Sequence, residues 1–124
     1  MIGYLVVTVG GGIGAAARYL LSAWVHAAFG QAFPWGTLLV NVVGSFIIGL
    51  VMVLSLERGI VSPEVRLLLT TGFCGELTTF STFSYETLAL LRGEQWLLAG
   101  ANTLVNLLLC FAATGMGMLL ARWI

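Results

Sequence analysis

The chain has 124 residues, of which 60% are hydrophobic and only 8% are charged, and its mean hydropathy is +1.05. A soluble domain of this size cannot bury so much apolar surface, so most of the chain must face lipid. Five arginines balance five glutamates, which leaves no basic surface for nucleic acid, and two cysteines with one histidine lack the spacing of a metal or thiol site.

Four apolar segments are each long enough to cross a hydrocarbon core of roughly 30 Å, which needs about 20 residues. The third segment begins at Pro63, with Ser62 as the N-cap, because proline is favoured at the first helical position. The sequence therefore predicts an all-α membrane protein with a single domain, residues 1–124. Its expected transmembrane helices are Ile2 to Phe29, Trp35 to about Leu56, Pro63 to Leu91, and Trp96 to Trp123.

An even number of crossings places both termini on one side of the membrane, together with the connection between the second and third helices. Three arginines lie on that side and one, Arg92, lies on the other. The positive-inside rule then favours a cytoplasmic N-terminus only weakly, so insertion in both orientations stays open. The three arginines are Arg58, Arg66 and Arg122.

The first helix carries a face of small residues and one charge. Gly10 with Gly14, and Gly11 with Ala15, are spaced so that another helix backbone can approach closely, and Gly44, Gly49, Ala113 and Gly117 predict the same in later helices. Arg18 lies deep in the helix, where an unpaired charge costs about 2.5–3.5 kcal/mol. Two interpretations are open: Arg18 caps helix ends from inside the bundle or snorkels to the interface, or it lines the vestibule of a pore.

The second helix has a stripe of hydrogen-bond donors. Thr37, Asn41 and Ser45 follow one another at intervals of four residues, so they share one helix face. The simplest explanation is a hydrogen bond between helices, worth about 1 kcal/mol. Alternatively, the amide of Asn41 replaces water around a small anion.

The third segment is too polar for a lipid-facing helix. Seven serines and threonines lie between Thr70 and Ser84, beside Gly72, Gly75 and Glu76. Non-helical backbone at membrane depth survives only where protein or a water-filled cavity covers it, so we expect the stretch Gly72 to Thr79 to be a break in the helix. Such breaks expose N–H groups that hold anions and carbonyls that hold cations.

Aromatic and polar residues flank this predicted break. Phe80 and Phe83 are three residues apart, and their positive ring edges can coordinate an anion without the tight binding of a full charge, although plain packing is the commoner role. In the fourth helix a second polar line recurs at every fourth residue, through Asn102, Asn106, Cys110 and Thr114.

These residues resemble the Fluc, or CrcB, family of fluoride channels over essentially the whole chain. The resemblance rests on GGGIGAAARY at Gly10 to Tyr19, GTLLVNVVGSFIIG at Gly36 to Gly49, TTGFCGELTTFSTFS at Thr70 to Ser84, and Thr114-Gly115. It implies an antiparallel, dual-topology homodimer with two fluoride pores and a structural sodium ion at its centre. Glu76 departs from the family, whose members usually have glycine at that position.

The resemblance also implies roles for individual residues. Asn41 is the pore amide, Phe80 and Phe83 provide the ring edges, and the backbone carbonyls of Gly75 and Thr78 bind the sodium ion. The remaining implied positions are Ser81, Thr82 and Glu86 in the pore-forming break, Thr37 and Thr114 in the polar lining, and Arg18 in an aqueous vestibule.

We therefore expect a multi-pass protein of the bacterial inner membrane that exports fluoride passively and catalyses no reaction. A small proton-coupled exporter is the main alternative, since Glu76 or Glu86 could titrate within the membrane. A non-transporting assembly subunit, in which the polar lines only join helices, is the third.

Overall fold

The computed structural model describes all 124 residues and consists of helices joined by short connections, with no strands. Three helices are uninterrupted and long and apolar enough to cross a membrane: α1 (Ile2–Phe29), α2 (Trp35–Leu56) and α6 (Trp96–Trp123). Their bounds confirm the predicted first, second and fourth segments. Most large apolar side chains point outward, as expected for helices surrounded by lipid.

The third crossing is made of four pieces rather than one helix. They are α3 (Pro63–Leu67), the π-helix η1 (Leu68–Cys74), α4 (Gly75–Leu77) and α5 (Phe80–Arg92). Ser62 accepts a hydrogen bond from the backbone N–H of Val65 and precedes Pro63, which confirms the predicted N-cap.

The predicted break is correct in place but wrong in extent. Only Thr78 and Thr79 leave the helix, with ψ of 159° and 116°, whereas residues 72–77 stay helical. Lipid offers no hydrogen-bond partners to free backbone groups, so the chain keeps helical bonds wherever it can. Residues 78 and 79 can leave the helix because side chains of other helices bind their backbone groups.

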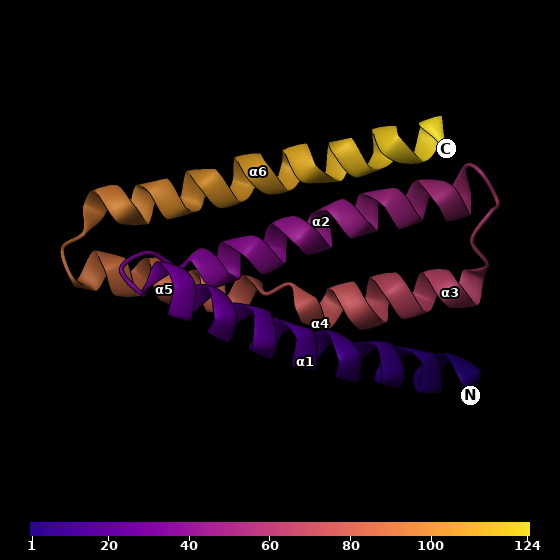
Figure 1. Cartoon of the computed structure of the whole chain (residues 1–124), viewed down its shortest axis with the longest axis horizontal. Coiled ribbons are helices and arrows are strands. Elements are labelled where there is room, and N and C mark those ends of the chain that lie inside the picture. The colour runs from indigo at the N-terminus through magenta and orange to yellow at the C-terminus, as the bar shows by residue number, and fades with distance from the viewer.

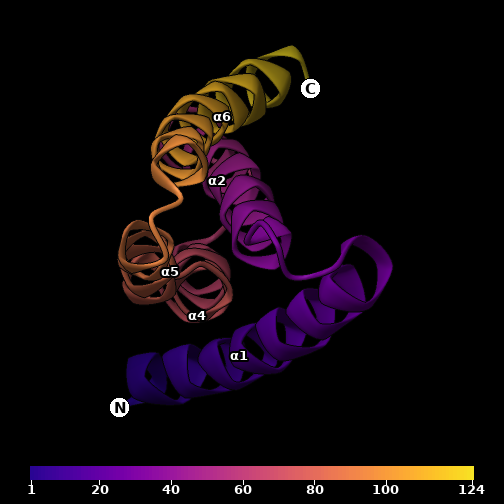
Figure 2. The ribbon, with the colours of Figure 1, turned by 90° about the vertical axis from the view of Figure 1, so that its left-hand side faces the viewer.

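The helices form an open arrangement rather than a closed bundle. Both termini and the α2–α3 connection lie at one end of the molecule (Figure 1), which confirms the topology expected from four crossings. Figure 2 shows α4 and α5 between α1 and the α2–α6 pair. Helices α1 and α6 make no contact with each other, so the two edges of the arrangement remain apart.

Small residues permit close contacts between backbones, as predicted. A Cβ atom at Gly49 or Gly117 would overlap a backbone carbonyl of the facing helix in the α2–α6 pair. A Cβ atom at Gly10 or Gly14 would overlap the carbonyl of Leu68 or Phe73 in η1. Dispersion between closely packed backbones is a main source of helix association in lipid, so these glycines hold α1 and α6 in place.

Charged side chains tie the helix ends together outside the membrane core. Arg58 donates to the carbonyls of Ala121 and Arg122 at 2.9 and 3.1 Å. Arg122 in turn forms two hydrogen bonds with the carboxylate of Glu57, at 3.0 and 3.1 Å. The hydrogen bond and the positive charge of Arg122 lower the pKa of Glu57 below its ordinary value of 4.5.

Candidate functional site

The amide of Asn41 on α2 holds the two-residue break. The backbone N–H of Thr79 donates to Asn41 Oδ1 at 2.8 Å, and Asn41 Nδ2 donates to the Thr79 carbonyl at 3.3 Å. Gly44, one turn further along α2, leaves room for the side chain of Thr78, because a Cβ atom there would overlap Thr78 Cγ2. Asn41 thus provides the hydrogen bonds that a continuous helix would make within itself.

The break frees particular backbone carbonyls. In a continuous helix the N–H of Thr79 would bond to the Gly75 carbonyl, but it bonds to Asn41 instead. Likewise the N–H of Thr82 would bond to the Thr78 carbonyl, but it donates to Thr79 Oγ1 at 3.2 Å, which makes Thr79 the N-cap of α5. Gly75 and Thr78, whose carbonyls are expected to bind sodium, are therefore among the residues around the break that lose their helical donors.

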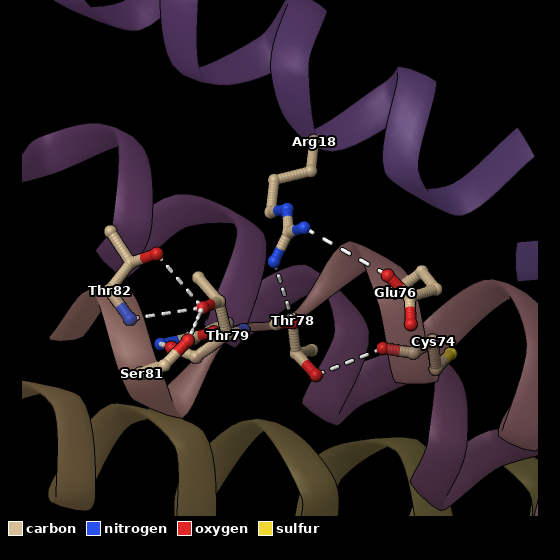
Figure 3. Close-up of polar contacts among 8 residues, drawn as sticks. Arg18, Cys74, Glu76, Thr78, Thr79, Ser81 and Thr82 are labelled. Carbon is tan, nitrogen blue, oxygen red and sulfur yellow. Dashed lines mark hydrogen bonds and ion pairs between the residues drawn. The ribbon is translucent and has the colours of Figure 1, made fainter. Parts of the chain in front are cut away.

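Arg18 reaches the break from α1 (Figure 3). Its Nη1 atom lies 3.5 Å from the Thr78 carbonyl oxygen, and its Nη2 atom lies 3.9 Å from Oε2 of Glu76. The guanidinium thus lies at the C-terminal end of α4, which agrees with the capping interpretation. It also lines a cavity, described below, so capping and a vestibule role are compatible.

A cavity of about 320 Å³ lies beside the break between α2, α5 and α6. Asn41, Phe80 and Phe83, three of the residues expected in the pore, line it together, and so do Ser45 and Asn106. The two phenylalanine rings are tilted by 57°, with their centroids 5.5 Å apart. This geometry turns a ring edge toward a neighbouring face, and Phe80 is 76% exposed.

A second cavity, of about 530 Å³, lies on the opposite side of the break, against α1. Arg18, Thr37 and Thr82 line it, and Thr79 lines both cavities. Thr37 donates a hydrogen bond of 2.6 Å to Oε1 of Glu86, which lines a third cavity at the α5–α6 end. The predicted site residues therefore form three neighbouring groups around the break rather than one cluster.

Two predicted residues lie apart from these groups. Thr114 is absent from the lining of all three cavities, and its backbone packs against Gly49. Ser81 is exposed on the first turn of α5 and contacts Thr79, with 3.3 Å between the hydroxyl oxygens.

A row of amide side chains links α6 to Asn41. Asn41 Nδ2 lies 3.2 Å from Oδ1 of Asn106, and Asn106 Nδ2 lies 2.9 Å from Oδ1 of Asn102. Asn102 then donates to Thr87 on α5 at 2.9 Å. The spacing of the fourth helix indicated a polar line, but it did not reveal that Asn106 shares a hydrogen bond with Asn41, because that contact depends on how closely α2 and α6 pack.

Polar groups are also exposed on the outer surface of the third crossing, where lipid would surround a single chain. They lie along one stretch around the break and comprise Thr71, Gly75, Glu76, Ser81 and Thr82. Ser81 and Thr82 contact Thr79, and Glu76 faces Arg18 at 3.9 Å, whereas the hydroxyl of Thr71 has no hydrogen bond within the chain. So many exposed polar groups make the surface unsuited to direct contact with hydrocarbon.

Comparison with known proteins places this arrangement in a family. The family described as CrcB-like protein, Camphor Resistance (CrcB) matches residues 5–118. A Geotalea uraniireducens protein named fluoride-specific ion channel FluC is 50% identical over 118 residues, which cover 95% of each chain. A protein with the same name from Geobacter metallireducens is 48% identical over 98% of each chain. Another, from Koribacter versatilis, is also 48% identical, over 89% of this chain and 87% of the relative.

Proposed function

Because the chain belongs to the CrcB-like family, we propose that it is a fluoride-specific ion channel, a multi-pass protein of the bacterial inner membrane that conducts fluoride passively. It is not an enzyme. The relatives named fluoride-specific ion channel FluC match nearly the whole chain at about half identity, so their activity is the best guide to its own.

The observation that carries the proposal is the break at Thr78 and Thr79, which ends α4 and starts α5 beside a cavity lined by both polar and apolar residues. The N-terminus of α5 brings partial positive charge to that cavity. Asn41, Phe80 and Phe83 line this cavity, where an amide N–H or a ring edge turned toward an anion would be a weak positive site, while no full positive charge lines it. Such a site favours a small anion yet releases it, as conduction requires.

Arg18 is suited to the approach to this site. It lines the second cavity on the other side of Thr79, where its full charge attracts anions toward the break. The carboxylate of Glu76 and the carbonyl of Thr78 partly neutralise the charge of the guanidinium, so Arg18 does not bind the anion permanently. A proton-coupled exporter is less favoured, since Glu86 is hydrogen-bonded to Thr37 and Glu76 faces Arg18.

The functional unit is an antiparallel homodimer in which a second copy covers the exposed polar surface around the break. Support comes from this surface, from the exposed ring of Phe80 and from the open arrangement of α1 and α6. Light scattering in detergent should give twice the chain mass of 13.2 kDa. A tag at the N-terminus should be protease-accessible on both sides of the membrane, and a monomer mass or a single orientation would contradict the dimer.

A sodium ion at the dimer centre fits the carbonyl groups of Gly75 and Thr78. Both carbonyls have lost their helical donors, and unwound carbonyls suit sodium. Arg18 Nη1 lies 3.5 Å from the Thr78 oxygen, so this carbonyl would hold the ion beside a guanidinium group. A sodium ion held by these carbonyls would supply a fixed positive charge at the contact between the two copies.

Fluoride release from proteoliposomes, measured with a fluoride electrode, tests the proposed function. Rapid release driven by a membrane potential, with no need for a pH gradient, is expected for a channel. Release that requires a pH gradient would favour the exporter instead. Absence of release from protein of the correct mass would favour an assembly subunit.

A further inference from the structure

The amides of Asn41, Asn106 and Asn102 have only one possible orientation. The Thr79 backbone N–H can only donate, so the oxygen of Asn41 must face it and the NH₂ group of Asn41 must face Asn106. The oxygen of Asn106 then faces Asn41, and its own NH₂ group donates to Asn102. One backbone N–H at the break thereby orients the whole row of amides.

This orientation uses both N–H donors of Asn41. One donates to the Thr79 carbonyl at 3.3 Å and the other to Asn106 Oδ1 at 3.2 Å. Asn41 therefore has no free donor in the cavity, although it is the amide expected to coordinate fluoride. An anion that binds Asn41 must displace one of these two oxygens.

The Asn106 oxygen is the one that an anion can displace. Thr79 is bonded to Asn41 through both its N–H and its carbonyl, so loss of that contact would release the break itself. Asn106 instead lies on α6 and lines the same cavity as Asn41, Phe80 and Phe83. Its NH₂ group stays anchored because it also donates to the backbone carbonyl of Asn102 at 3.0 Å.

We propose that Asn106 sets the strength of fluoride binding in this cavity, because its amide oxygen competes with the anion for one N–H of Asn41. This inference rests on the proposed function and assigns Asn106 a positioning role that acts through Asn41. Asn106 is only 5% exposed, so its displaced oxygen loses its donor without gaining water. The competition weakens binding and speeds release, which a conducting site needs.

The size of the effect follows from the hydrogen bond that the anion must replace. A hydrogen bond of this kind contributes about 1 kcal/mol, which corresponds to about fivefold in an equilibrium constant. Removal of the competing oxygen should therefore lower the fluoride concentration for half-maximal flux by about fivefold or more. The maximal flux should fall as well, because the anion leaves more slowly.

The test compares Asn106→Ala with the matched control Asn102→Ala in proteoliposomes over a range of fluoride concentrations. Asn102→Ala removes a neighbouring buried amide, but Asn106 keeps its bond to the backbone carbonyl of residue 102 and still faces Asn41. The control should shift half-saturation by less than twofold. Asn106→Val retains more bulk and should behave like Asn106→Ala if the alanine variant folds poorly.

A second measurement does not depend on conduction. The side-chain NH₂ resonance of Asn41, identified by its loss in Asn41→Ala, is followed by NMR in nanodiscs during titration with sodium fluoride. In Asn106→Ala the resonance should reach half of its shift at about fivefold less fluoride than in the unmodified protein.

The outcomes separate the two claims. If the unmodified protein conducts fluoride but both Asn106 variants keep its half-saturation, the inference is wrong and the proposed function stands. If the unmodified protein conducts no fluoride, the proposed function is wrong. In that case the titration decides the inference, which is overturned if the Asn41 resonance does not respond to fluoride or responds equally in the variant.

Discussion

Replacement of Asn41 by alanine should destabilise the protein as well as stop conduction, because Asn41 holds the break. The change leaves the backbone N–H of Thr79, a residue only 7% exposed, without its partner. An unpaired buried N–H costs about 1–3 kcal/mol. The lost bonds to the Thr79 carbonyl and to Asn106 cross between helices and add about 0.6 kcal/mol each in lipid. The expected loss is therefore about 2–4 kcal/mol.

The assay is reversible unfolding in detergent, followed by tryptophan fluorescence, with Ser45→Ala as the control. Ser45 lies one turn further along the same face of α2 and lines the same cavity, yet it makes no side-chain hydrogen bond. Its replacement should change stability by less than about 0.5 kcal/mol. If Asn41→Ala is no more destabilising than Ser45→Ala, Asn41 does not hold the break and the reasoning fails.

Three further predictions concern packing, the ring edges and pH. Gly49→Ala should destabilise the protein by about 1–3 kcal/mol, because the added Cβ atom would overlap the α6 backbone. The control Gly12→Ala should have no such effect, because a Cβ atom at Gly12 faces open space. Equal melting temperatures of the two variants would contradict this. Phe80→Leu and Phe83→Leu should retain the fold but lose most fluoride flux, and normal flux in both would rule out ring-edge coordination. The ion pair between Glu57 and Arg122 should stabilise the protein above about pH 4.5 and should lose this effect as the pH falls through the lowered pKa of Glu57. The melting temperatures of the unmodified protein and of Glu57→Gln should therefore converge in acid. A constant difference between the two melting temperatures from pH 7 to pH 3 would contradict this.

Much of the fold could be predicted because lipid imposes strict rules on sequence. Two of the uninterrupted helices end where an apolar stretch meets Gly30 or Glu57, and the third lies between the flanking tryptophans Trp96 and Trp123, so their bounds were readable. The break could be located from the density of serine and threonine. Its extent was predicted wrongly because the composition of Gly72 to Thr79 does not reveal which residues find side-chain partners in other helices.

The site was predictable as a set of residues but not as an arrangement. Spacing placed Asn41 on one face of the second helix and Asn106 on one face of the fourth, yet neither spacing indicated that the two amides bond to each other. The ion pair of Arg18 with Glu76 was missed for the same reason, since it joins elements that are far apart in sequence. Contacts of this kind depend on helix packing, which glycine spacing restricts but does not determine.

The reversal potential of single channels in a planar bilayer tests the central claim most directly. With chloride equal on both sides and fluoride tenfold higher on one side, a fluoride-selective channel should reverse at the fluoride equilibrium potential, about 59 mV for a tenfold gradient of a monovalent ion. The potential should not move when a pH gradient is added. Reversal at 0 mV would mean that chloride carries the current, and a reversal potential that follows the pH gradient would mean that protons take part; either result would contradict a passive fluoride-selective channel.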